Sequence, residues 1–464
     1  MIRSRGSILV GLLWCLALLS VIVIGVLHTA TLDLMVVKNH GDLIQAHYLA
    51  LAGVEKAKAL LYQDAITRRR SRLNHTGDLA DAPQQFRDVP LGRGRFRVFR
   101  PGSPEEGGKP VFGISDEESR LNVNSASAEE LEKLEGMTPD VIAAILDWRD
   151  TDNAVSPGGA EADYYTSLQP PSLPRNGPLQ TIRELLMVRG VSPTLLLGRR
   201  SNPAGSFDAS AYPDEDELPG EDQEGGWSRL LTVNSSVQNV NAAGDDRIDL
   251  KSADETSLTG VQGITPAIAK AIVAARGQNK IENLADLLDV VPPRPEDATP
   301  PPANSGGAPT SVVRQAPPPQ TAPPPNQAGG PPSGEKLVNE KLLMDIADDL
   351  TTEADADLPG RVNINTANLL VLSCLPGISR ELAQAIIAYR QSSGFFPNIA
   401  CLLKVPGMNR QIFKQVAPRV TARSETFRIL SEGKVSSSGA RKRIQAIVHV
   451  GSTHIDTLSY REDL

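Results

Sequence analysis

Residues suited to catalysis are scarce in this chain of 464 residues. It contains three cysteines, six histidines and only 4% aromatic residues. No histidine stands in a motif with a serine, a cysteine or a second metal ligand, and there is neither a P-loop nor a dinucleotide-binding fingerprint. We therefore expect a protein without catalytic activity.

Net positive charge is also absent. The formal net charge is −8 and the isoelectric point is near 5.5, whereas a nucleic-acid-binding domain usually shows a basic patch. Glycine and proline are abundant, with 38 and 36 residues, and much of this excess lies in linkers. The length allows two to four domains.

One long apolar run stands near the amino end. Residues 7–27 contain no charged side chain, and about 20 apolar residues cross the hydrocarbon core of a bilayer. Arg3 and Arg5 precede the run, which predicts a cytoplasmic amino end and a large domain across the membrane. The run is too long for a signal peptide and lacks a small-x-small cleavage site. A plain signal anchor is therefore a stronger alternative for this segment than a cleaved signal peptide.

The same helix continues to Tyr62 without proline, now apolar on one side only. Small and apolar residues recur at steps of three and four, at Leu43, Ala46, Ala50, Gly53, Ala57 and Leu60. This stripe predicts packing against the protein's own sheet. Strand patterns follow at residues 94–101 and 111–124 and return after residue 419, so the sheet is expected to be interrupted by what lies between.

Three repeats fill the interruption. The segments 121–150, 248–277 and 362–391 each begin extended, form a helix, turn at a glycine and form a second helix. The turn glycines are Gly136, Gly263 and Gly377. The expected caps of the first helices are Ser125, Ser252 and Thr366. Each segment is a helix-hairpin-helix unit, and a second half-repeat follows it, with a turn glycine in the first and third copies.

These patterns predict an α+β protein in which a small antiparallel sheet is interrupted by a large all-α insertion. The expected boundaries are a leader at 1–6, a transmembrane helix at 7–27, its amphipathic continuation at 28–66, the first part of the α/β domain at 67–123, helical unit 1 with an acidic insertion at 124–208, an acidic linker at 209–246, helical unit 2 at 247–292, a disordered Pro-rich linker at 293–336, helical unit 3 at 337–420, and the last strands at 421–464.

The first unit carries an acidic insertion after Trp148. Its oxygen donors are Asp150, Asp152, Asn153, Glu161 and Asp163. Hard oxygen ligands at short spacing, with no histidine or cysteine nearby, favour Ca²⁺ over zinc or a redox metal. The spacing is not that of an EF-hand, and a solvated acidic loop is the alternative.

Two cysteines, Cys374 and Cys401, flank one helical segment of the third unit. A compartment outside the cytoplasm permits disulfides, so we hypothesise a bridge between them. Two buried free thiols are the alternative.

Helix-hairpin-helix units often bind DNA through backbone amides of a glycine-rich turn. The DNA-binding form favours a second glycine two residues after the first, where this chain has Thr138, Thr265 and Ser379. No cluster of lysine or arginine follows the turns. The repeats therefore favour packing on helices or on a partner protein, with a membrane-anchored periplasmic DNA receptor as the competing class.

The amino end resembles the leader of type IV pilins and type II secretion pseudopilins, in which a prepilin peptidase cuts after a glycine. The cut would fall between Gly6 and Ser7 here. Most such proteins carry glutamate at the fifth mature position, which pairs with the free amine of the subunit ahead. This chain has Gly11 there, which suits a subunit with no neighbour ahead, at a filament tip.

The whole pattern resembles one family, protein K of the general secretion pathway, the large minor pseudopilin of the type II secretion system. The resemblance lies in HYLALAGVEKAKALL, in DWRDTDN with GGAEADYY and NGPLQTIRELLMVRGVSP, and in RVNINTAN with LPGIS. It implies a pilin-like domain in the periplasm, a single-pass anchor in the inner membrane, and calcium bound in the acidic insertion. It also implies a pseudopilus tip shared with minor pseudopilins I and J, and contacts with other pseudopilins and the inner-membrane assembly platform.

Overall fold

The computed structural model describes residues 6–77, 79–103, 106, 109–200, 223–292 and 336–462. Residues 1–5 of the predicted leader, 209–222 of the predicted acidic linker and 293–335 of the predicted Pro-rich linker lie outside the described residues.

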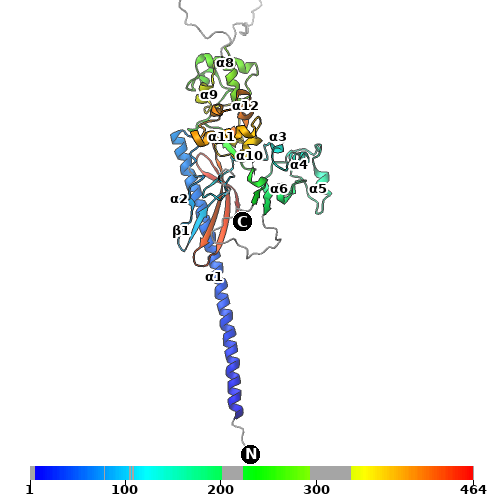
Figure 1. Cartoon of the computed structure of the whole chain (residues 1–464), viewed down its shortest axis with the longest axis vertical. Coiled ribbons are helices and arrows are strands. Elements are labelled where there is room, and N and C mark those ends of the chain that lie inside the picture. Colours follow the sequence, from blue (N-terminus) through cyan, green and yellow to red (C-terminus); the bar gives the residue numbers. More distant parts are fainter. Residues whose placement is uncertain are drawn as a thin grey trace, which may run out of the picture.

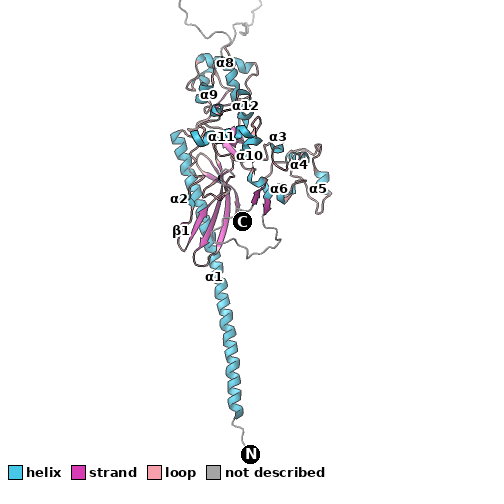
Figure 2. Ribbon diagram, in the orientation of Figure 1, coloured by secondary structure: helices cyan, strands magenta, loops and turns pink. Residues whose placement is uncertain are grey.

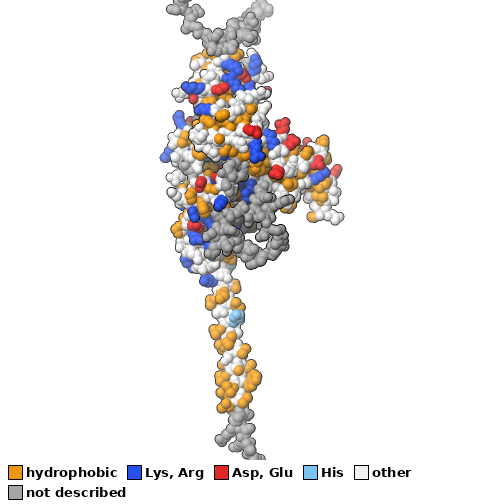
Figure 3. Space-filling model, in the orientation of Figure 1, with side chains coloured by type: hydrophobic (Ala, Val, Ile, Leu, Met, Phe, Trp, Pro, Cys, Tyr) orange, Lys and Arg blue, Asp and Glu red, His pale blue; other side chains and the backbone are white. Residues whose placement is uncertain are grey.

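Helix α1 (Gly6–Ser71) is the longest element and spans 66 residues, which is about 100 Å at 1.5 Å per residue. Its front half projects from the rest of the molecule (Figure 1) and carries apolar side chains that face outward (Figure 3). Trp14, for example, is 68% exposed. Among the described helices, α1 alone is long and apolar enough to cross a membrane.

The back half of α1 packs on the sheet (Figure 2). Ala46, Ala50 and Ala57 are fully buried, which confirms the centre of the predicted stripe. Leu60 is partly buried and packs against the same core, whereas the prediction was wrong at Leu43, which is 48% exposed. The contact with the sheet begins after Leu43 and continues past Leu60, since Leu61 and Ala65 are buried in the same core.

The sheet is antiparallel and joins residues from both ends of the chain. Its strand order is β1-β2-β14-β15-β16, and β3 also pairs with β14. The strands are β1 (Val89–Leu91), β2 (Gly94–Val98), β3 (Ser115–Asp116), β14 (Thr426–Val435), β15 (Arg441–Val450) and β16 (Ile455–Arg461). The short helix α2 (Pro83–Phe86) precedes β1. A long amino-terminal helix on an interrupted antiparallel sheet confirms the predicted α+β, pilin-like fold.

The inserted region consists of three helical units, each closed by a pair of two-residue parallel strands. Unit 1 contains β4 (Leu121–Asn122), α3 (Ala128–Glu132), α4 (Pro139–Arg149), α5 (Ala162–Thr166), η2 (Ile182–Met187), α6 (Pro193–Leu197) and β7 (Leu231–Thr232). Unit 2 contains β9 (Ile248–Asp249), α7 (Glu255–Thr259), α8 (Pro266–Gly277), η4 (Leu284–Asp289), α9 (Glu340–Ile346) and β10 (Leu350–Thr351). Unit 3 contains β12 (Val362–Asn363), α10 (Leu369–Cys374), α11 (Arg380–Ser393), η6 (Ile399–Lys404), α12 (Arg410–Val416), η7 (Ala417–Arg419) and β13 (Val420–Thr421).

Residues 223–246, which were predicted to continue the acidic linker, include structured elements. These are β6 (Gln223–Gly225), η3 (Trp227–Arg229), the strand β7 that closes unit 1, and β8 (Ser236–Gln238). β6 pairs with β5 (Gly198–Arg200), and β8 pairs with β11 (Asp357–Pro359). The predicted linker therefore ends earlier than residue 246.

The Pro-rich segment was predicted to separate units 2 and 3, but it lies inside the second hairpin of unit 2. Leu337 donates its N–H to the carbonyl of Val290 at 3.0 Å and so closes that hairpin across residues 293–335. The same bond closes the second hairpins of units 1 and 3, from Val191 to Val188 and from Met408 to Val405. Unit 2 thus ends at β10, and α9 belongs to it rather than to unit 3.

The first helix of each unit begins two residues later than predicted. The observed caps are Ser127, Asp254 and Asn368, whose side chains accept a backbone N–H three residues on. The predicted caps Ser125, Ser252 and Thr366 lie in a preceding turn. That turn is fixed by Asn122, Asp249 and Asn363, whose side-chain oxygens accept the N–H two residues on.

An arginine at the end of the second helix ties each hairpin together. Arg149 donates to the carbonyls of Val123 and Ala126, which precede the first helix. Arg276 and Arg390 repeat this arrangement, with donor–acceptor distances of 2.7 and 2.8 Å to the carbonyls of Ala253 and Ala367. The repeat in the sequence is therefore also a repeat of one hydrogen-bonded clamp.

The middle unit docks on the others. One hydrophobic core runs through all three units, and Lys414 of α12 forms ion pairs with Asp286, at 3.1 Å, and Asp289 of η4. In Figure 1 units 2 and 3 lie beyond the end of the sheet, away from the free half of α1, and unit 1 projects to one side.

Candidate functional site

Three carboxylates meet where α4 ends and the acidic insertion returns to the unit. Asp147 lies in the last turn of α4, Asp150 caps that helix, and Glu161 precedes α5. One oxygen from each lies within 4.8 Å of the others. The structure thus brings together two of the predicted ligands, Asp150 and Glu161, and adds Asp147, which the sequence argument missed. A carboxylate one turn before Asp150 on an otherwise apolar helix was the signal that could have found it.

Three oxygens of this cluster lack hydrogen-bond partners among the described residues. Oδ1 of Asp150 and both carboxylate oxygens of Glu161 are buried without a hydrogen bond. Asp147 is fully buried and accepts a hydrogen bond only from the N–H of Ser156, at 3.2 Å from Oδ2. Burial, together with the neighbouring carboxylates, raises the pKa of Asp150 and of Glu161. Unpartnered, mutually repelling carboxylates are the donor set that a divalent cation neutralises.

The remaining predicted ligands lie outside the cluster. Asp152 Oδ1 accepts the N–H of Ala154 at 2.8 Å, and Asn153 Oδ1 accepts Nδ2 of Asn176 at 2.8 Å. Asp163 is exposed in the first turn of α5. These three side chains shape the loop or face solvent in the structure.

A buried aromatic pair joins the two helices that carry the carboxylate cluster, α4 and α5. Trp148 and Tyr165 meet edge to face with ring centroids 5.0 Å apart, and Nε1 of Trp148 donates to Glu184 at 3.1 Å. Arg189 donates to the carbonyl of Gly159 at 2.8 Å. At Gly159 an added Cβ would lie 2.7 Å from the Asp147 carboxyl carbon, so glycine lets the loop approach the cluster.

The hairpin turns, which are the candidate nucleic-acid contacts, pack inside the units. Gly136 and Gly263 have φ of +77° and +105°, and an added Cβ would lie 2.8 Å from Leu195 of α6 and 3.0 Å from Leu342 of α9. The second helices begin at the caps Thr138, Thr265 and Ser379, as predicted. Each first-hairpin turn therefore rests on the second hairpin of its own unit.

Basic side chains close to the turns are already engaged. Lys133 donates to the carbonyl of Leu375 at 2.7 Å, and Arg410 pairs with Glu340 at 3.1 Å. Lys414 is held between two aspartates, as described above. These three side chains are therefore not free to contact phosphates.

The predicted disulfide is not formed. Cys374 and Cys401 are both buried free thiols. The Cys374 thiol donates to the carbonyl of Leu370 at 3.2 Å, one turn earlier on α10, while Cys401 lies in η6. Burial raises the pKa of both thiols, that of Cys374 to about 11, so they are packing residues.

One family model matches most of unit 1. Residues 119–198 match the model of the type II secretion system (T2SS) protein K family, which spans the clamp arginine, the acidic insertion and α6. Over these residues the chain is similar to the type II secretion protein K family. Residues 244–291 and 360–421 match the helix-hairpin-helix motif. The second match coincides with unit 3, and the first stops where the Pro-rich segment enters unit 2.

The comparisons also found partial matches to other proteins and one solved structure. ComE operon protein 1 of Bacillus subtilis is 34% identical over 73 residues, 16% of this chain and 36% of that protein. Endonuclease/exonuclease/phosphatase family domain-containing protein 1 of Mus musculus is 26% identical over 209 residues, 44% of this chain and 33% of that protein. The chain thus spans about a third of the length of these relatives. A solved GspK-GspI-GspJ complex of the enterotoxigenic Escherichia coli type 2 secretion system aligns with a TM-score of 0.42, 12% identity, 90% of this chain and 98% of that chain.

Proposed function

We propose that the chain is a non-catalytic minor pseudopilin that caps the tip of the type II secretion pseudopilus together with minor pseudopilins I and J. In this role it starts assembly of the filament and supports protein export across the outer membrane. The observation that carries the proposal is the division of α1 into an uncovered apolar half and a half buried on the sheet.

The uncovered half suits two environments in turn. Its outward apolar side chains lie in the inner membrane before assembly, with the amino end in the cytoplasm and the rest of the chain in the periplasm. After processing between Gly6 and Ser7 and extraction from the bilayer, the same side chains pack against the helices of other pseudopilins. The assembly platform and the prepilin peptidase are the further partners of this pathway.

The shape supports a terminal position. Units 2 and 3 lie beyond the sheet at the end opposite the free half of α1 (Figure 1), where a subunit added ahead would have to sit. The residue at the fifth mature position, Gly11, offers no carboxylate to such a subunit. Both features are expected of a subunit that ends the filament.

The test is co-purification of the full-length chain, in detergent, with tagged minor pseudopilins I and J. We expect both to be recovered in stoichiometric amounts, and a major pseudopilin alone to be recovered poorly. Failure to recover either minor pseudopilin would refute the tip assignment. Salt-dependent binding to duplex DNA would instead favour a membrane-anchored periplasmic DNA receptor, the competing class for helix-hairpin-helix repeats.

We also propose that Ca²⁺ binds at Asp147, Asp150 and Glu161. The support is chemical: the donor set is all oxygen, part of it is buried without partners, and Ca²⁺ prefers such ligands. The ion would neutralise the cluster and hold the insertion against α4, which fixes the surface of unit 1 rather than supplying a reaction.

A further inference from the structure

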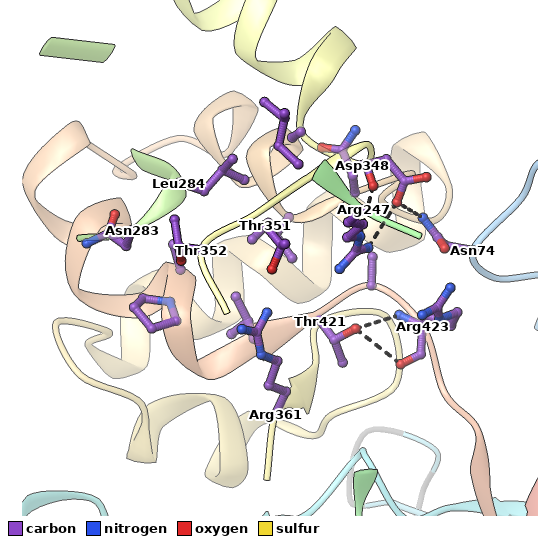
Figure 4. Close-up of a pocket in the computed structure, with 18 residues that line it drawn as sticks. Asn74, Arg247, Asn283, Leu284, Asp348, Thr351, Thr352, Arg361, Thr421 and Arg423 are labelled. Atoms are coloured by element: carbon purple, nitrogen blue, oxygen red, sulfur yellow. Dashed lines mark hydrogen bonds and ion pairs between the residues drawn. The ribbon is translucent and has the colours of Figure 1, made fainter. Parts of the chain in front are cut away.

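A small cavity lies where units 2 and 3 meet the loop that follows α1 (Figure 4). Its volume is about 40 Å³, room for about three water-sized spheres. Three arginines line it: Arg247 at the start of unit 2, Arg361 just before unit 3, and Arg423 just after unit 3. Such a concentration of guanidinium groups in a buried space requires compensation by negative charge.

Two of the three arginines are compensated. Arg247 donates to the carbonyl of Asp348 at 2.9 Å and to its carboxylate at 3.2 Å. Arg423 lies 3.3 Å from the Glu425 carboxylate and donates to the carbonyl of Asn241 at 3.1 Å. Each of these guanidinium groups therefore has a carboxylate and a carbonyl of its own.

Arg361 is compensated more weakly than the other two arginines. Its guanidinium forms no hydrogen bond to any residue that the structure describes, and its nearest carboxylate, Glu353, lies 3.8 Å away. The Arg361 side chain is 14% exposed, whereas Glu353 is 41% exposed and solvated. Burial and the charge of Arg247 lower the pKa of Arg361 to about 10. The structure thus contains a largely buried guanidinium that lines the cavity and forms no hydrogen bond within the described part of the chain.

A hydroxyl shares the cavity with this guanidinium. Thr352 lines the cavity, and within the described part of the chain its hydroxyl takes part in no hydrogen bond. In Figure 4 Arg361 lies below Thr351 and Thr352, with its guanidinium directed toward them. The Thr351 hydroxyl is already used, because it accepts the N–H of Glu353 at 3.1 Å. Arg361 and Thr352 therefore both offer unused donors to the cavity, as does Nε of Arg423, which is buried without a hydrogen bond.

We propose that this cavity binds a small inorganic oxyanion, of the phosphate or sulfate class, held by Arg361 and Thr352. A planar guanidinium matches two oxygens of such an anion, and a hydroxyl donates to a third. The volume excludes a nucleotide or a lipid headgroup. Because Arg361 and Thr352 flank different units, the bound anion would link unit 2 to unit 3.

The test measures thermal unfolding of the full-length protein in detergent, with EGTA present so that phosphate does not act through calcium. Sodium phosphate and sodium sulfate are each titrated from 0 to about 50 mM, with sodium chloride keeping the ionic strength constant. We expect a saturable rise in melting temperature of a few degrees for the unmodified chain. Arg361→Gln should abolish the rise, and Thr352→Val should weaken it. The matched control is Arg70→Gln, which removes an exposed arginine of α1 and should retain the full rise.

A second measurement separates this site from an ordinary structural arginine. Without oxyanion, Arg361→Gln removes a largely buried charge that is only weakly compensated, so the melting temperature of the variant should equal or exceed that of the unmodified chain. A lower value would assign Arg361 a structural role and overturn the proposal. Equal rises with chloride alone, a rise that persists in Arg361→Gln, or no rise in the unmodified chain would each overturn it as well.

Discussion

Replacing Asp150 with asparagine should have opposite effects on stability with and without calcium. In EGTA the three carboxylates of unit 1 repel one another across at most 4.8 Å. Two unit charges at that distance repel by about 3 kcal/mol at an effective dielectric constant of about 20, and proton uptake and solvent relieve part of this. Asp150→Asn should therefore raise the free energy of unfolding in EGTA by about 1 kcal/mol and the melting temperature by a few degrees.

With calcium the sign reverses. An ion present at one hundred times its dissociation constant stabilises the native state by about 2.7 kcal/mol. This raises the melting temperature by roughly 5–10 °C for a cooperative unit of about 150–250 residues. Asp150→Asn removes one ligand and one charge, so most of this rise should disappear. The unmodified chain would then be the less stable protein in EGTA and the more stable one in calcium.

The assay is thermal unfolding of the full-length protein in detergent, in 1 mM CaCl₂ or 1 mM EGTA, followed by circular dichroism. Asp163→Asn is the matched control on the same loop, because the Asp163 side chain is exposed and lies outside the cluster. It should keep most of the calcium response. If Asp150→Asn destabilised the protein in EGTA and retained the full response to calcium, the site would be refuted.

Three further predictions concern the helical units. In urea unfolding, Gly136→Ala should lower the free energy of unfolding by about 2 kcal/mol or more, because φ is positive and the new methyl would lie 2.8 Å from a side chain of α6. The control Gly439→Ala also has a positive φ, of +71°, but open space around it, and should lower the free energy of unfolding by only about 1 kcal/mol. Equal losses would contradict the packing argument. Arg276→Ala should lower the free energy of unfolding by about 2–3 kcal/mol, since two carbonyls lose a charged donor, and Arg276→Lys should recover part of it. Under denaturing, non-reducing conditions, mass spectrometry should find Cys374 and Cys401 both alkylated; a mass corresponding to a bridge would restore the disulfide.

Local patterns in the sequence predicted the elements well. The uncharged run and the small-residue stripe gave α1, and the strand patterns at both ends of the chain gave one interrupted sheet. Repeated spacing gave three hairpins with turns at Gly136, Gly263 and Gly377, each with a positive φ. These features depend on residues close together in the chain, and helix and strand periodicity report them directly.

The acidic site was predicted only in part. The insertion and its preference for Ca²⁺ follow from residue types, but which oxygens converge depends on how the loop folds back on α4. Asp152 and Asn153 satisfy the loop's own backbone and amide groups, while Asp147 enters from the helix. A list of acidic residues within one loop could not separate these roles.

The sequence by itself determined that the chain has a long apolar amino-terminal helix, an interrupted sheet and three hairpin repeats, because periodicity and turn residues act over a few positions. Only the tertiary structure decided how the middle unit is completed. Its second hairpin closes between Val290 and Leu337, on opposite sides of residues 293–335, and β10 pairs with β9. The missing turn glycine marked the break but not the partner, because a hydrogen bond between residues so far apart in sequence depends on the packing of both segments against one core.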